Sequence, residues 1–151
     1  MILEGQTDPH APDSLVCFTI GAFSYALDVT LVREVTKIAS IYPVPSVPAP
    51  ILGVISLRGA TLALVDATQL LALPASTSST ALVIAGNQPP ICALLIGRVI
   101  GVVRFDKALF TAARRDLDPP EVLGSLEDAR GPLRVLDPSY LLHKLDELRF
   151  R

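Results

Sequence analysis

Few residues in this 151-residue chain have the types and spacing needed for acid–base, nucleophilic or metal chemistry. Its two histidines are His10, in a polar leading segment, and His143, on a predicted C-terminal helix. Neither belongs to a recognised metal-ligand spacing, and no Gly-x-Ser-x-Gly turn presents a serine nucleophile. Cys17 and Cys92 lie in apolar runs, where buried, reduced thiols are expected. The pattern therefore predicts a non-enzyme that has no metal site and no cofactor.

Other ligand classes are also disfavoured by composition. Residues 97–101 contain two glycines but lack the lysine and the third glycine of a phosphate loop. A net charge of −2 and an aromatic content of 5% give no basic, stacking surface for nucleic acid. The mean hydropathy is +0.49, yet no apolar run approaches the ~20 residues of a membrane helix. The apolar residues are therefore expected in a core or an interface.

Arg58 is the charged side chain that most needs a partner. It follows residues 51–57, of which five are Ile, Leu or Val, and Gly59 supplies the backbone freedom of a turn. A guanidinium at the tip of such a hairpin must reach water, a carboxylate or another protein. Glu34 is a possible carboxylate partner. Arg58 is thus either half of a structural salt bridge or a contact to a partner protein.

The elements that would position these residues are mainly strands. Strands are expected over residues 15–20, 23–27, 51–57, 60–66, 81–85, 91–96, 97–105, 122–126 and 133–136. Short helical turns are expected over residues 29–35 and 66–71, and Asp137-Pro138 begins a C-terminal helix with a leucine stripe. Residues 43–50 hold four prolines and predict an extended surface loop, and residues 106–121 predict a solvated one. Residues 1–14 read as a flexible tail, and 15–151 as a single domain with a linker near 74–80.

A weak internal repeat accompanies these elements. Arg58-Gly59 is followed by Asp66 and a leucine pair, and Arg130-Gly131 is followed by Asp137 and a leucine pair. The hairpin at 15–27 similarly parallels the one at 82–95. Two halves of about five short strands each would close into two small barrels. Chance similarity of strand–turn–strand patterns is the alternative explanation.

Several of these segments resemble the CheW family. They are Tyr25-Ala26-Leu27, Val32-Arg33-Glu34-Val35, residues 41–45, Gly53-Val54-Ile55-Ser56-Leu57-Arg58-Gly59 and Val65-Asp66. The resemblance covers about residues 14–148. It implies two five-stranded, SH3-like barrels that share a hydrophobic core. It also implies a cytoplasmic, non-catalytic adaptor, recruited to membrane-associated receptor arrays, that joins chemoreceptor tips to the regulatory domain of a CheA-type histidine kinase.

The same resemblance assigns partner-binding positions. They are Val32, Glu34, Gly53 and Arg58, with Leu82, Val83, Leu94, Leu95 and Ile96 on an apolar strand pair. In the family the groove between the barrels takes the receptor helix, and one barrel face meets the kinase.

This chain also departs from the family pattern. Ser56, Ala63 and Gly97-Arg98 stand where the family usually has other residues. The departure at Gly97-Arg98 leaves room for a member that binds one partner only, in a specialised pathway. A small-molecule sensor or enzyme that uses the cleft between the barrels is the alternative from another functional class.

Overall fold

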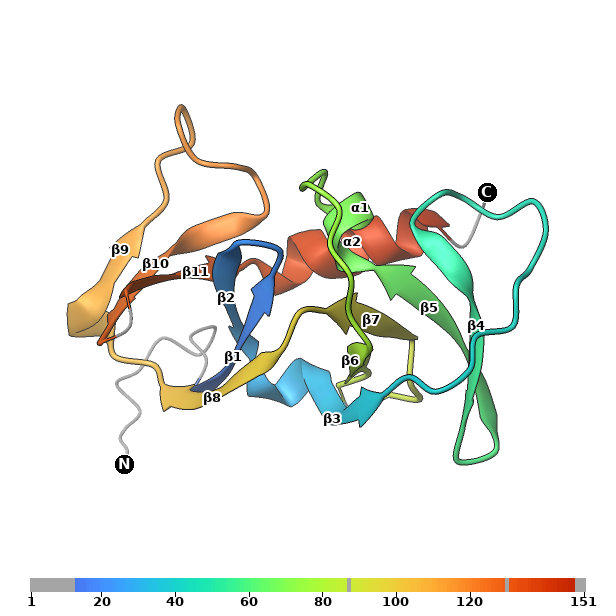
Figure 1. Cartoon of the computed structure of the whole chain (residues 1–151). Helices are drawn as coiled ribbons and strands as arrows, with labels where there is room; N and C mark the ends of the chain where they lie inside the picture. The colour runs from blue at the N-terminus through green and yellow to red at the C-terminus, as the bar shows by residue number, and fades with distance from the viewer. Residues whose placement is uncertain (1–12, 87, 130, 149–151) are drawn as a thin grey trace.

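The computed structural model describes residues 13–86, 88–129 and 131–148, which form a mainly β structure (Figure 1). Its strands are β1 (Ser14–Ile20), β2 (Phe23–Asp28), β3 (Val32–Lys37), β4 (Ile51–Leu57), β5 (Ala60–Asp66), β6 (Thr80–Ile84), β7 (Cys92–Ile96), β8 (Val99–Arg104), β9 (Phe110–Ala112), β10 (Val122–Asp128) and β11 (Gly131–Leu136). The helices are α1 (Ala67–Leu70) and α2 (Pro138–Leu148), and the 3-10 turns are η1 (Val29–Leu31) and η2 (Lys107–Leu109). Residues 1–12 of the expected tail, and Arg130 of the expected repeat, lie outside the described residues.

The strands form two sheets that lie side by side, with the six-stranded sheet on the left of Figure 1. Its strand order is β8-β1-β2-β11-β10-β9, and the order of the five-stranded sheet is β3-β6-β7-β5-β4. Each sheet curls around its own apolar cluster, so we call them the six-stranded and the five-stranded barrel. The predicted fold class is confirmed, with β9 as an additional strand in one barrel.

The two halves of the sequence exchange hairpins. The β1–β2 hairpin of the first half joins β8–β11, and the β6–β7 hairpin of the second half joins β3–β5. The exchange is completed by parallel pairing of β2 with β11 and of β7 with β5. The two sheet orders therefore correspond strand for strand, apart from β9. This agrees with the repeat, but a barrel does not coincide with a half of the sequence.

The exchanged hairpins also build the shared core. Along β1, Val16, Phe18 and Ile20 face the cluster between the barrels, whereas Leu15 and Cys17 face the interior of the six-stranded barrel. Strand β6 divides its side chains in the same way between the shared core and the interior of the five-stranded barrel. A strand buried on both faces has no polar face, which explains the continuous apolar runs of the sequence.

Helix α2 covers the junction of the barrels. Asp137 accepts a hydrogen bond from the Ser139 amide at 2.9 Å, and Pro138 occupies the first helical position, where its missing N–H is not needed. Leu141 and Leu145 pack into the shared core. Among the described residues, no helix has the length and apolar character required to cross a membrane.

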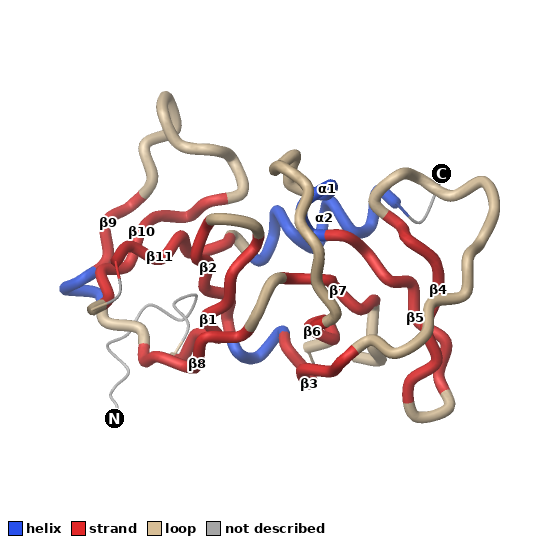
Figure 2. Tube along the Cα trace, in the orientation of Figure 1, coloured by secondary structure: helices blue, strands red, loops and turns tan. Residues whose placement is uncertain are grey.

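Two local expectations differ from the structure, and one connection has a pairing that was not expected. The helical turn expected over 29–35 ends at Leu31, and Arg33 and Glu34 lie on β3, because the β-branched residues there pair with β6. The loop expected over 106–121 contains η2 and the short strand β9. The long connection before β4 (tan, right of Figure 2) is held by a bridge between Tyr42 and Val54, which occupies the place that β9 has in the other barrel.

Candidate functional site

Glu34 and Arg58 form an ion pair that joins the two edges of the five-stranded sheet. Glu34 lies on β3 and Arg58 at the β4–β5 turn, where its φ is +51°. Arg58 donates from Nη2 to Glu34 Oε2 at 2.9 Å, and from Nε to both carboxylate oxygens at 3.1 and 3.2 Å. Since β3 and β4 are the two edge strands, this forked contact closes the barrel on one side.

The electrostatics of the pair favour its charged state. The hydrogen bonds from Arg58 lower the pKa of Glu34, and the same bonds raise the pKa of Arg58. The Arg58 side chain is 78% exposed and that of Glu34 is 22% exposed. Arg58 is therefore bonded to Glu34 and still exposes its guanidinium to solvent. The two roles expected for Arg58, a structural salt bridge and a contact to a partner protein, are thus compatible.

Gly53, near the start of β4, helps to close the same barrel. Its φ is +151°, and a Cβ atom built there would lie 2.5 Å from the Tyr42 carbonyl oxygen. The close approach permits the reciprocal backbone hydrogen bonds between Tyr42 and Val54, at 2.8 and 2.9 Å. Gly124 of β10 makes the equivalent close approach to Thr111 of β9. Gly53 is buried and positions backbone, since it has no side chain to offer a partner.

The remaining predicted positions are divided between surface and core. Val32 is half-buried at the start of β3 and packs against the shared core. Leu95 is also half-buried, beside the interior of the five-stranded barrel. The other four side chains are buried: Leu82, Leu94 and Ile96 in the shared core, and Val83 in the five-stranded barrel. Among these, Val32 and Leu95 retain surface that another molecule can touch.

Gly97-Arg98, which the sequence interpretation set apart from the resembled pattern, lies where the chain crosses between barrels. Gly97 donates its amide to the Thr19 carbonyl at 2.7 Å, and a Cβ atom there would lie 2.2 Å from Thr19 Oγ1. The Arg98 amide donates to Thr19 Oγ1 at 3.0 Å. Glycine at 97 is thus required by the packing of the crossover against β1.

The surface of the chain carries apolar residues that the sequence interpretation did not place among the partner-binding positions. Ile41, Tyr42 and Val44 precede β4 and are 44%, 58% and 38% exposed, and Val35 on β3 is 46% exposed. On the six-stranded barrel the exposed apolar side chains are Val102, Leu109, Leu117 and Leu123. Ile41, Tyr42 and Val44 stand among or beside prolines, a composition that forms little core and could have indicated an exposed apolar segment.

The histidine and cysteine side chains of the described part of the chain lie apart from one another: His143 is on α2 and Cys92 is buried in β7. His143 is 72% exposed on α2, with Nε2 at 3.5 Å from Glu147 Oε2. Burial raises the pKa of the Cys92 thiol to about 12, so that thiol is neutral. The described residues include no group of three His, Cys, Asp or Glu side chains arranged to hold a metal ion.

Comparisons with known proteins agree with this geometry. A family model described as the CheW-like domain matches residues 14–146. The chain is 32% identical over 138 residues to the chemotaxis protein CheW of Rhizobium meliloti (strain 1021), covering 89% of this chain and 85% of that protein. The crystal structure of the scaffolding protein TtCheW from Thermoanaerobacter tengcongensis has the same fold, with a TM-score of 0.72, 22% identity, and coverage of 84% of this chain and 90% of that chain. This chain belongs to the family of CheW-like domains.

Proposed function

We propose that this chain is a non-catalytic adaptor that couples the cytoplasmic tips of methyl-accepting chemoreceptors to the regulatory domain of a CheA-type histidine kinase. It acts in the cytoplasm, recruited to membrane-associated receptor arrays, without inserting into the bilayer, binding nucleic acid or using a cofactor. The supporting observation is that Glu34 and Arg58, which belong to the family's motifs, pair across the barrel edges and leave the guanidinium exposed.

For the receptor we propose a helix that lies in the groove between the barrels. Val32 and Val99 begin the edge strands β3 and β8, each just after a crossover between barrels, and both pack half-buried against the shared core. A helix with an apolar stripe would gain affinity by covering such residues, and charges near them would fix its register. Leu95 offers a further half-buried contact, whereas Leu82, Val83, Leu94 and Ile96 would act indirectly, by holding the strands in place.

For the kinase we propose that one barrel face meets the matching domain of the partner, with Arg58 at that contact. Gly53 supports this face by keeping β4 against Tyr42. The exposed apolar residues Val35 and Tyr42 lie on the same barrel and would add buried area.

Binding assays with a chemoreceptor tip fragment and a kinase regulatory domain test the proposal. Arg58→Ala is expected to weaken binding of one partner while lowering the urea midpoint no more than Glu34→Gln does, since both variants lose the same ion pair. Lys37→Ala, which removes an exposed cation on the same barrel, serves as the matched control. Val32→Ala is expected to weaken receptor binding, with Leu123→Ala, at an exposed position on β10 of the other barrel, as control. A ternary complex would establish bridging. Binding of a single partner would favour a specialised family member, and binding of neither would refute the adaptor.

A further inference from the structure

Two cavities meet beneath the proline-rich loop, at the end of the five-stranded barrel next to α2. The first, of about 580 Å³, lies between residues 46–50, α1 and α2, and we call it the outer chamber. The second, of about 400 Å³, lies between the same loop, β5, β7 and α2, and we call it the inner chamber. Val47, Pro48 and Leu148 line both chambers, so the two adjoin at these side chains.

The inner chamber is lined almost entirely by aliphatic side chains. These are Val47, Pro48, Ile51, Ala63, Val65, Ile91, Leu145 and Leu148, together with the Cys92 thiol. The lining includes no aromatic ring on which a flat ligand could stack and no formal charge. Because the Cys92 thiol stays neutral, it behaves as a small apolar group. Such a chamber suits a flexible aliphatic chain.

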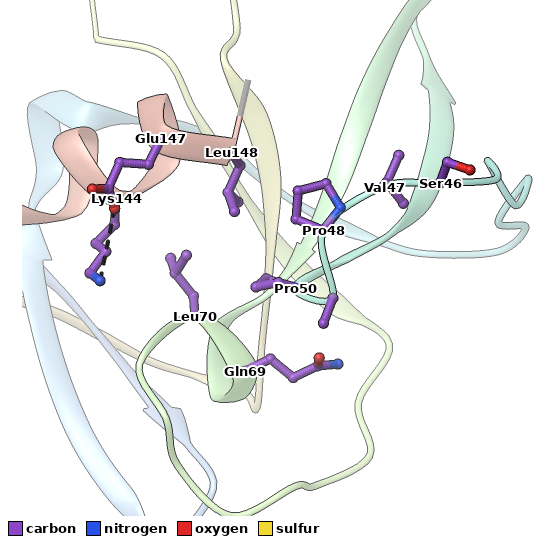
Figure 3. Close-up of a pocket in the computed structure, with 10 residues that line it drawn as sticks. Ser46, Val47, Pro48, Pro50, Gln69, Leu70, Lys144, Glu147 and Leu148 are labelled. Carbon is purple, nitrogen blue, oxygen red and sulfur yellow. Dashed lines mark ion pairs between the residues drawn. The ribbon is translucent and has the colours of Figure 1, made fainter. Parts of the chain in front are cut away.

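The outer chamber adds polar groups at its edge. In Figure 3, Leu70 and Leu148 face Pro48 and Pro50 across the opening, with Lys144 and Glu147 on the side of α2 and Gln69 on α1. The Lys144 ammonium holds Glu147 Oε1 at 3.9 Å, a long contact, and the other Glu147 oxygen lies 3.5 Å from His143. Lys144 can therefore exchange this weak pair for a carboxylate that enters the chamber.

We propose that the two chambers bind a free medium-chain aliphatic monocarboxylic acid, with its chain in the inner chamber and its carboxylate at Lys144. The proline-rich loop favours this, because fixed φ angles at Pro48 and Pro50 form the mouth before a ligand arrives. This site is separate from Arg58 and Val32, and its existence does not depend on the proposed partner proteins.

Calorimetric titration of the full chain with decanoate and with 1-decanol, each below its aggregation limit, tests the site. Ala63→Leu fills the inner chamber and is expected to weaken decanoate binding by about tenfold or more. Ala60→Leu, at an exposed position on the same strand, is the matched control and is expected to change nothing. Lys144→Gln is expected to weaken decanoate binding while leaving 1-decanol binding unchanged.

The folded state of each variant is checked by its urea midpoint. If leucine at 63 prevents folding, Ile91→Trp replaces it, since Ile91 lies on the exposed rim of the inner chamber. Absence of saturable decanoate binding would overturn the proposal. So would equal binding by the wild type and the chamber-filling variant, or equal loss of both ligands in Lys144→Gln. Co-sedimentation with phosphatidylglycerol vesicles without decanoate binding would replace the free acid with a membrane lipid and also overturn it.

Discussion

Replacing Gly53 with alanine tests whether this position stabilises the chain by letting β4 lie close to Tyr42. The new methyl group would lie 2.5 Å from the Tyr42 carbonyl oxygen and 2.9 Å from the Ile41 Cγ2 atom. Backbone atoms cannot rotate away as a long side chain can, so β4 and the segment before it must separate. That separation breaks both hydrogen bonds between Tyr42 and Val54, the closing bridge of the five-stranded barrel.

The expected cost follows from two contributions. A φ of +151° is strained by about 1–2 kcal/mol for a residue with a side chain. Loss of the two hydrogen bonds adds about 1 kcal/mol each, so Gly53→Ala should destabilise the chain by about 3–4 kcal/mol. In a chain of this size that lowers the melting temperature by about 10 °C.

Two other glycines supply the controls. Gly59 has a φ of +81° but open space around its Cβ position, so Gly59→Ala should cost only about 1–2 kcal/mol, from strain alone. Gly101, in β8, has neither strain nor a close neighbour, so Gly101→Ala should stabilise by about 0.5 kcal/mol. Urea unfolding measures all three. The reasoning fails if Gly53→Ala is no more destabilising than Gly59→Ala. The close packing of Gly53 against the Tyr42 carbonyl would then contribute nothing to the free energy of unfolding.

Three further predictions concern charge and burial. The lowered pKa of Glu34, below 4.5, means that its ion pair stabilises the chain above pH 4.5 and stops doing so as the pH falls through that lowered pKa. The urea midpoint of the wild type should thus exceed that of Glu34→Gln at neutral pH and match it in strong acid; a difference that persists in acid would contradict the assignment. Cys17 and Cys92 are buried, so a thiol reagent should label them only as fast as the chain unfolds, and rapid labelling of the native protein would contradict that burial. Leu94→Ala should destabilise the chain by about 3 kcal/mol without changing the affinity of the folded fraction for partners, measured below the unfolding midpoint; a selective loss of affinity would make Leu94 a contact.

Local features of the fold were predictable because their causes are local. Residues 60–66 were expected as a strand and form β5, since alternation and an adjacent Gly59 turn define both the element and its start. The prediction of a helical turn over residues 29–35 was wrong for its second half. Asp28 does cap a helical turn, but the valines that follow are stabilised as a strand by pairing with β6, which begins at Thr80. No local pattern carries that information.

The exchange of hairpins could not be predicted for the same reason. Tyr25 and Arg134 are register partners in the parallel pairing of β2 and β11, and they are 109 residues apart. At the candidate site, the ion pair of Glu34 and Arg58 was one of two alternatives, because charge complementarity is visible in a sequence while exposure is not. The apolar runs of β6 and β7 arise from burial on both faces. Sequence alone does not distinguish that burial from an apolar docking surface.

Because of the hairpin exchange, the two barrels obtain their last strands at different times during translation. Strands β3 to β7 are complete once Ile96 has been made, so the five-stranded barrel has all its strands while the ribosome is still translating. The β1–β2 hairpin is made before the other described strands, yet β11, its parallel neighbour, ends only at Leu136. During that interval Leu15 and Cys17 have no barrel interior to enter. The earliest of the described strands therefore wait longest for their barrel to be completed. A nascent chain halted between Ile96 and Leu136 would expose the apolar β1–β2 hairpin to chaperones and proteases.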